Sequence, residues 1–203
     1  EIRNPLTSLK GFLQLLKSTL NNVPDYYDIM TDEIERIEGI TSELLLHAKP
    51  QAYNFHRENI VAITENVVTL LYSQALMNNV VINVALDEVP DVLCIRNQIK
   101  QVLINIMKNA IESMPNGGEV TIHLKQKTNE EISLTITDQG SGIPKEYLQK
   151  VGMPFYTTKE KGTGLGMLTT FKIVESHGGK IDISSEIEKG TVVDITLLID
   201  PKI

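Results

Sequence analysis

The sequence has one cysteine and no cluster of metal ligands. Cys94 is the single cysteine among 203 residues, which excludes an internal disulfide and is typical of a reducing compartment. Its apolar neighbours predict a buried position in a strand, where a thiol is unreactive. The four histidines lie far apart without the spacing of zinc ligands, so we expect no zinc site. They are His47, His56, His123 and His177.

Positive charge and long apolar runs are also scarce. The chain has 19 lysines and arginines against 26 aspartates and glutamates, a net charge of -7. This excludes nucleic acid as the main partner, because phosphate contacts need a basic face. No apolar run approaches the ~18 residues of a membrane helix, and no signal peptide is recognisable. The chain begins at Glu1 inside a helical pattern, which is typical of a piece of a longer protein whose upstream segments are missing.

Residues 1–49 predict a helical hairpin. Apolar residues recur at spacings of three and four in two series, which the turn at 21–24 separates. Because neither helix can bury its stripe against one partner alone, we expect two hairpins to form a four-helix bundle, hence a homodimer. The alternative is that the hairpin packs on the following domain. The series are Ile2, Leu6, Leu9, Leu13, Leu16 and Leu20, then Met30, Ile34, Ile37, Thr41, Leu44 and Ala48.

The remainder predicts an α+β domain over residues 60–203, after a linker at 50–59 that carries Pro50 and mixed polar residues. Asn59 can cap the first helix of this domain. The order of helices and adjacent antiparallel strands favours a two-layer sandwich, a sheet covered on one face. Helices are expected at about 59–79, 97–114 and up to 177, and strands at 80–86, 92–95, 120–125, 132–137, 180–185 and 191–199.

A first glycine cluster, Asp138-Gln139-Gly140-Ser141-Gly142, ends an expected buried strand. The two glycines let the backbone turn tightly and approach a flat ligand. A carboxylate at this position can accept a hydrogen bond from an exocyclic amine such as that of adenine. Taken alone, this pattern is more often that of an ordinary turn.

A second glycine cluster, Gly162-Thr163-Gly164-Leu165-Gly166, opens a helix and predicts a phosphate site, since backbone N–H groups and the positive dipole end meet there. It is neither of the two commonest nucleotide loops. The dinucleotide pattern needs glycine where Met167 stands, and the P-loop pattern fails because Ile181 follows the only Gly-Lys pair. The cluster therefore belongs to another nucleotide fold.

Two asparagines, Asn105 and Asn109, lie one turn apart on an expected helix and share a face. Amide oxygens can coordinate Mg²⁺, which takes few protein ligands and keeps phosphate and water as the rest. Lys108 beside them can contact phosphate. The alternative is a pair of solvated asparagines.

Taken in order, five motifs resemble the N, G1, F, G2 and G3 boxes of the sensor histidine kinase catalytic domain, a member of the gyrase, Hsp90, histidine kinase and MutL ATPase superfamily. They are Asn-x-x-x-Asn at 105–109, Asp-x-Gly-x-Gly at 138–142, Pro-Phe-Tyr-Thr-Thr-Lys at 154–159, Gly-Thr-Gly-Leu-Gly at 162–166 and Lys-Gly-Thr at 189–191. The resemblance covers residues 60–199.

This resemblance implies binding of ATP and Mg²⁺. Asn109 is the implied metal ligand with Asn105 nearby, Asp138 the residue that recognises adenine, and 141–164 a mobile lid. The related hydrolases usually carry a glutamate at the position of Asn105, so this asparagine favours phosphoryl transfer to a protein over hydrolysis. The implied ATP-binding residues are Asn105, Lys108, Asn109, Asp138, Gly140, Gly142, Ile143, Thr158, Lys159, Gly162, Thr163, Gly164, Leu165, Gly166 and Thr191.

The N-terminal residues 1–7, Glu-Ile-Arg-Asn-Pro-Leu-Thr, resemble the H-box of the same family with its histidine removed. The resemblance implies an acceptor histidine just before Glu1. Glu1 can take the imidazole proton, and Asn4 can position the ring. The alternative for Glu1 is a solvated carboxylate at a helix end. Residues 9–16 resemble the sporulation sensor kinases of spore-forming bacteria, and Phe12 and Leu15 there either widen the hairpin core or form a docking patch.

Together these patterns predict a histidine autokinase that passes phosphate to an aspartate of a response regulator, in a sporulation phosphorelay. The expected partners are a second copy, the regulator and inhibitor proteins that dock on the hairpin. The expected location is the cytoplasmic region of a membrane-bound sensor. A serine-directed kinase or an ATPase is the rival within the superfamily, and a dimeric module that binds ATP without transferring phosphate is the rival outside it.

Overall fold

The structure is a computed structural model that describes residues 30, 34, 54–159 and 162–201. Residues 52–154 and 166–203 form one compact unit, and residues 155–165 belong to a second unit together with residues 1–51. Apart from Met30 and Ile34, the predicted hairpin lies outside the described residues, and so does its bundle. The account below concerns the first unit unless another is named.

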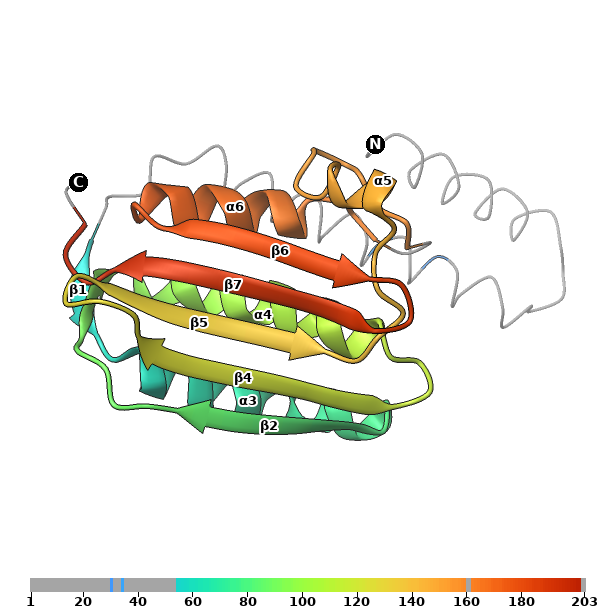
Figure 1. Ribbon diagram of the computed structural model, residues 1–203, viewed down its shortest axis with the longest axis horizontal. Helices are drawn as coiled ribbons and strands as arrows, with labels where there is room; N and C mark the ends of the chain where they lie inside the picture. Colours follow the sequence, from blue (N-terminus) through green and yellow to red (C-terminus); the bar gives the residue numbers. More distant parts are fainter. Residues whose placement is uncertain (1–29, 31–33, 35–53, 160–161, 202–203) are drawn as a thin grey trace, which may run out of the picture. The chain divides into compact units, whose positions relative to one another are not determined.

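The first unit alternates short connections with regular elements (Figure 1). Apart from β1 and α5, which were not predicted, its helices and strands follow the predicted order, and their bounds differ from the predicted ones by a few residues. They are β1 (His56–Glu58), α3 (Ile60–Met77), β2 (Val80–Leu86), β3 (Val92–Cys94), α4 (Arg96–Glu112), β4 (Gly118–Gln126), β5 (Glu131–Asp138), α5 (Lys145–Leu148), α6 (Gly166–Ser176), β6 (Lys180–Glu186) and β7 (Gly190–Leu198).

Five strands form one mixed sheet in the order β2-β4-β5-β7-β6. β2 and β4 pair in parallel, and all other neighbours are antiparallel. The parallel pair requires a crossover, which β3 and α4 provide. Asp138, the last residue of β5, lies opposite Thr191 of β7. The sheet therefore places the Asp-x-Gly-x-Gly motif at 138–142 beside the Lys-Gly-Thr motif at 189–191.

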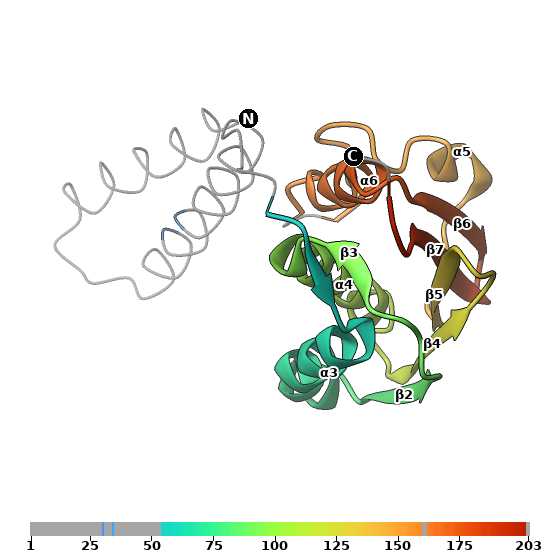
Figure 2. The ribbon, with the colours of Figure 1, turned by 90° about the vertical axis from the view of Figure 1, so that its left-hand side faces the viewer.

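The helices α3, α4 and α6 cover one face of this sheet (Figure 2). Alternate residues of each central strand are buried against them, as the period of two predicts. The buried residues of α4 recur every three or four positions, as expected for one helix face. The predicted two-layer α+β sandwich is confirmed. Its core includes Ile63, Val67, Leu103, Met107, Ile111, Ile122, Leu124, Leu134, Ile136 and Ile195.

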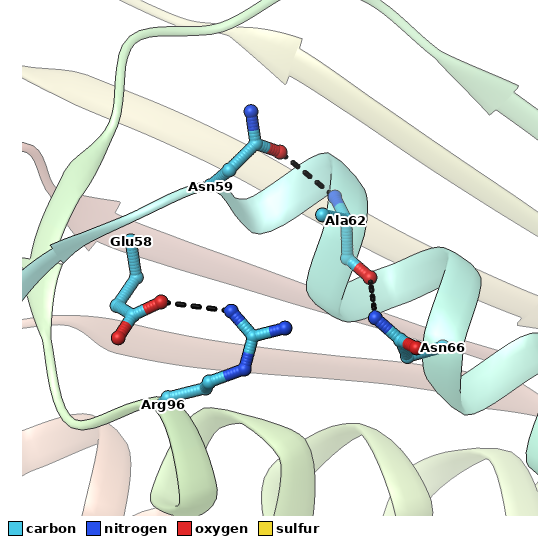
Figure 3. A network of polar contacts seen from close by, with 5 residues as sticks. All are labelled: Glu58, Asn59, Ala62, Asn66 and Arg96. Carbon is cyan, nitrogen blue, oxygen red and sulfur yellow. Dashed lines mark hydrogen bonds and ion pairs between the residues drawn. The ribbon is translucent and has the colours of Figure 1, made fainter.

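Helix α3 begins at a side-chain cap, as predicted. The Oδ1 atom of Asn59 accepts a hydrogen bond from the Ala62 backbone N–H at 2.8 Å (Figure 3), which satisfies one of the unpaired amides of the first turn. By length and composition α3 also qualifies as a candidate membrane span, with a mean hydropathy of 1.4. Its stripe of Ile60, Ile63 and Val67 is buried in the domain core.

Part of the predicted linker is a strand. Residues 56–58 form β1, which pairs antiparallel with β3 so that His56 lies opposite Cys94. The Glu58 carboxylate also accepts a hydrogen bond from the Arg96 guanidinium at 2.9 Å (Figure 3). Three polar residues carry no alternating pattern, and the strand exists only because β3 offers a partner.

Candidate nucleotide-binding site

The carboxylate of Asp138 is held at the end of β5 by several donors. The residue is buried, with 7% of its surface exposed. Its Oδ1 atom accepts the Gly140 N–H at 2.8 Å and the Thr191 N–H at 3.2 Å, and it lies 3.2 Å from the Ser113 hydroxyl oxygen. Hydrogen bonds to an ionised acceptor are among the stronger ones in proteins. This arrangement fixes the orientation of the carboxylate that the sequence assigns to adenine.

Gly140 and Gly142 are required by the protein's own packing. A Cβ atom at position 140 would lie 2.0 Å from the Ser113 hydroxyl oxygen, and one at position 142 would lie 2.1 Å from the Glu186 carbonyl oxygen. Gly142 also has a φ of +71°, which side-chain-bearing residues rarely adopt. Sequence reasoning attributed these glycines to a tight turn and to the approach of a ligand; the described close contacts are with Ser113, directly after α4, and with β6.

Ser185 joins the loop after β5 to Thr191. Its Oγ atom accepts the Ile143 N–H at 2.7 Å and lies 3.0 Å from the Thr191 Oγ1 atom. It also donates to the Gly190 carbonyl at 2.9 Å. Sequence reasoning missed this residue. The available signal was its place at the end of the expected strand 180–185, because it lies opposite Thr191 if that strand pairs with the next one.

Asn105 binds the start of α6 through its amide. Its Nδ2 atom donates to the Gly166 carbonyl at 2.9 Å and to the Thr170 hydroxyl at 3.2 Å, and its Oδ1 atom accepts from Gln101 at 2.8 Å. Both amide hydrogens therefore have partners within the protein. Of the paired asparagines on α4, Asn105 thus anchors the glycine-rich turn at Gly166.

Lys108 and Asn109 follow on α4. Lys108 is exposed, and Asn109 is partly buried one turn beyond Asn105. α4 also contacts both the Asp138 turn and the start of α6. Ser113, directly after α4, contacts Asp138, and Asn105 contacts Gly166. The predicted positions on α4, on β5 with its following loop, on β7 and at the start of α6 thus belong to one unit.

The remaining predicted residues lie elsewhere. Thr158, Lys159, Gly162, Thr163, Gly164 and Leu165 belong to the segment 155–165 of the second unit. Within it the Thr157 hydroxyl accepts the Lys159 N–H at 3.1 Å, and the Thr163 hydroxyl accepts the Leu165 N–H at 3.3 Å. Glu1 and Asn4 lie outside the described residues.

The side chains of this site that could bind a metal fit a Mg²⁺ ion that is held mainly by a nucleotide. Among residues 54–159 and 162–201, no group of three or more histidines, cysteines, aspartates and glutamates could hold a metal ion. Mg²⁺ commonly takes one or two protein oxygens and completes its shell with phosphate and water. Asn109 carries an amide oxygen on the same helix as Lys108, which matches that requirement.

Two buried titratable groups lie near the start of α4. Burial raises the pKa of the Cys94 thiol to about 12, and the Glu58 carboxylate adds to this while Arg96 opposes it. The predicted buried strand position of Cys94 is confirmed. Burial lowers the pKa of the His177 imidazole below its ordinary value, against the effect of a hydrogen bond with the Ile173 carbonyl.

A sheet with three helices on one face, an aspartate at a strand end and a glycine-rich helix start together define a nucleotide-binding domain, and the comparisons specify it. Residues 94–201 match the family of histidine kinase-, DNA gyrase B- and HSP90-like ATPases, and residues 1–52 match the His Kinase A (phospho-acceptor) domain. The chain belongs to this ATPase family and combines the two domains of a sensor histidine kinase, as the sequence motifs predicted.

Three known proteins illustrate the relationship. Sporulation kinase E of Bacillus subtilis is 45% identical over 97% of this chain and 27% of its own length. The catalytic domain of histidine kinase ThkA is 32% identical, with a TM-score of 0.64 over 72% of this chain and 96% of that domain. Histidine kinase ThkA in complex with response regulator protein TrrA is 30% identical, with a TM-score of 0.82 over 99% of this chain and 59% of the ThkA chain. The chain spans 27% to 48% of the length of the sporulation kinases it matches.

Proposed function

We propose that the protein is an ATP-dependent histidine kinase that phosphorylates a histidine immediately before Glu1 and passes the phosphoryl group to an aspartate of a response regulator. The observation that carries the proposal is the buried carboxylate of Asp138, oriented by the backbone amides of Gly140 and Thr191. A carboxylate fixed at the end of a central strand can accept a hydrogen bond from the exocyclic amine of adenine. Membership of the histidine kinase-like ATPase family supports the same assignment.

The adenine end of the site is built by the two strand ends. Asp138 would accept a hydrogen bond from the adenine amine, and Thr191 would lie beside the base. Ser185 would hold the Thr191 hydroxyl and the Ile143 amide in place, because it contacts both. The base would thus meet a surface whose polar groups are already oriented, which lowers the entropy cost of binding.

The phosphate end of the site is built by α4 and by the start of α6. The first backbone amides of α6 carry the positive end of the helix dipole and would bind phosphate oxygens. Lys108 would add a positive charge, and Asn109 would hold Mg²⁺, which neutralises phosphate charge when bound. Residues 158, 159 and 162–165 would complete the phosphate contacts as part of a lid.

In the transfer itself, an imidazole nitrogen would form a bond to the γ-phosphorus while the bond from phosphorus to the bridging oxygen breaks and ADP leaves. Glu1 would accept the imidazole proton, and Asn4 would position the ring. The phosphoryl group would then pass from this nitrogen to an aspartate carboxylate of the regulator. Positioning and electrostatics supply most of the catalysis in such a reaction.

The assembly follows from the domain division into hairpin (1–49), linker (50–59) and catalytic domain (60–203). The hairpin would form the dimer and offer docking surfaces to the regulator and to inhibitor proteins. ThkA, in its structure, is bound to a response regulator protein, and the relatives that are 39–47% identical are sporulation kinases. We therefore propose a sporulation phosphorelay as the pathway and the cytoplasmic part of a membrane-bound sensor as the location.

The test uses a longer protein that includes the residue before Glu1. Incubation with γ-labelled ATP and Mg²⁺ should give a protein-bound label that acid removes and base does not. Replacing the residue before Glu1 by glutamine should abolish the label while ATP affinity stays within twofold. Asp138→Asn should reduce both the amount of label and the ATP affinity.

The other outcomes separate the rival functions. An acid-stable label would indicate a serine-directed kinase, and release of free phosphate without any label would indicate an ATPase. ATP binding with neither label nor phosphate release would indicate a module that binds nucleotide without catalysis. Each of these results would contradict the histidine kinase assignment.

A further inference from the structure

His177 lies buried at the end of α6 with both ring nitrogens in use. Only 2% of its surface is exposed. Its Nδ1 atom lies 2.7 Å from the Ile173 carbonyl oxygen, and its Nε2 atom accepts the Ile95 backbone N–H at 3.1 Å. These partners require a neutral ring with the proton on Nδ1, because a carbonyl accepts and an N–H donates. The imidazole therefore joins the C-terminal turn of α6 to the residue that precedes α4.

Helix α6 is consequently attached to α4 at both of its ends. Asn105 binds the Gly166 carbonyl at the start of α6, and His177 binds the Ile95 amide at its end. Ile95 is the N-cap residue of α4 and makes no side-chain capping bond. A displacement of His177 would therefore alter how α6 lies on α4, the helix that carries Lys108 and Asn109.

The ring of His177 also contacts the segment that leads into the domain. The Phe55 ring packs on it with centroids 4.9 Å apart and planes inclined by 46°. Strand β1 follows directly and pairs with β3, which ends at Cys94, one residue before Ile95 (Figure 2). Arg57 contacts Asp200 and donates to the Asp91 carbonyl, so that this segment is held at several points.

We propose that His177 couples the entry segment 55–58 to the nucleotide site, acting as a positioning residue for α4 and α6. Docking of Phe55 on the imidazole would hold the α6–α4 arrangement in which the phosphate site is formed. Release of the segment would loosen that arrangement and weaken nucleotide binding. The inference rests on the proposed function, since it assumes that α4 and α6 bind the phosphates. Coupling of this kind is reciprocal, so bound nucleotide must also stabilise the segment.

The first experiment is a double-mutant cycle on the whole chain. Titration calorimetry with a non-hydrolysable ATP analogue and Mg²⁺ compares the wild type with Phe55→Ala, His177→Phe and the double variant. Each single substitution should weaken binding three- to tenfold, and the double variant should bind no more weakly than the weaker single variant. Additive losses, or affinities within twofold of the wild type, would overturn the proposal.

Two further variants separate positioning from general stability. His177→Gln places a side-chain oxygen where Nε2 accepts the Ile95 amide, so it should recover part of the affinity that His177→Phe loses. Ile122→Val trims the core on β4, where the residue is fully buried, and should lower the melting temperature without changing nucleotide affinity. If Ile122→Val weakened binding as much as the His177 variants, the effect would be one of stability and the proposal would be wrong.

Hydrogen–deuterium exchange provides the reciprocal test. The ATP analogue should slow exchange of the amides of 56–58 in the wild type but not in His177→Phe. Equal slowing in both proteins, or none in the wild type despite nucleotide binding, would contradict the coupling. A wild type that fails to bind the analogue would instead contradict the proposed function, so the two failures are distinguishable.

Discussion

The carboxylate of Asp138 accepts the backbone N–H of Thr191, a residue 53 positions later in the chain, at 3.2 Å. Asp138 ends β5, and its register partner Thr191 is the second residue of β7. The same Oδ1 atom also accepts the Gly140 N–H. The orientation of this carboxylate therefore depends on two strands and the glycine turn.

Replacing Asp138 with asparagine should weaken nucleotide binding. The amide keeps the size of the side chain and an oxygen acceptor, but it loses the charge-assisted hydrogen bond to adenine, worth about 1.5–3 kcal/mol. We expect a roughly 10- to 100-fold loss of affinity in a calorimetric titration. Asp182→Asn, at an exposed position of β6, is the matched control and should bind as the wild type. Unchanged affinity in Asp138→Asn would remove Asp138 from the adenine site.

The two asparagines of α4 should differ in their dependence on metal. Asn109→Ala should remove most of the gain in ATP affinity that Mg²⁺ confers, because it deletes the proposed ligand. Asn105→Ala should weaken binding equally with Mg²⁺ and with a chelator, since its amide holds the start of α6 through the Gly166 carbonyl. Titrations under both conditions measure the difference. A loss confined to the Mg²⁺ condition in Asn105→Ala would make that residue a ligand as well.

Gly142→Ala should destabilise the domain. The added Cβ atom would meet the Glu186 carbonyl oxygen at 2.1 Å, and the positive φ alone costs about 1–2 kcal/mol. The melting temperature should fall by several degrees. Gly166→Ala is the control, because its Cβ atom would lie 3.7 Å from Asn105, an ordinary contact, and should leave the melting temperature unchanged or slightly higher. A Gly142→Ala protein as stable as the wild type would show that the loop moves away without cost.

The thiol of Cys94 should be inert in the folded protein. Burial and a pKa raised to about 12 leave almost no thiolate at pH 8. A thiol reagent should therefore react with the native protein far more slowly than with the protein in denaturant. Because the chain has one cysteine, the reaction reports global unfolding directly. Fast labelling of the native protein would indicate that β3 opens locally.

Stability should fall as the pH drops below the ordinary histidine pKa of about 6.5. Burial lowers the pKa of His177 in the folded state, so in this range the unfolded chain takes up a proton first and unfolding becomes more favourable. Strand β1 and the start of α4 carry Glu58 and Arg96, which form an ion pair. Urea unfolding at pH 7.5 and 5.5 measures the loss of stability. The loss should be smaller in His177→Gln, because that variant lacks the buried imidazole and keeps all the other titratable groups. An equal loss of stability in both proteins would show that groups other than His177 cause it.

Periodicity in the sequence predicted most of the regular elements. Helices α3 and α4 and strands β4, β5 and β7 agree with the predicted ranges within a few residues, because buried and exposed positions alternate along them at the period of the element. Strand β1 was not predicted, since three polar residues have no period. It forms through pairing with β3, in which Cys94 lies 38 residues after its register partner His56.

By itself the sequence determined the class of the protein, because the order and spacing of its motifs are local properties of the chain. The roles of several residues were decided by the tertiary structure alone. Ser113 and Ser185 contact the site, and His177 binds Ile95 from 82 positions away. Gly140 and Gly142 are needed where α4 and β6 approach them closely. Such contacts join residues far apart in the chain, and only the packing of the helices on the sheet brings them within reach.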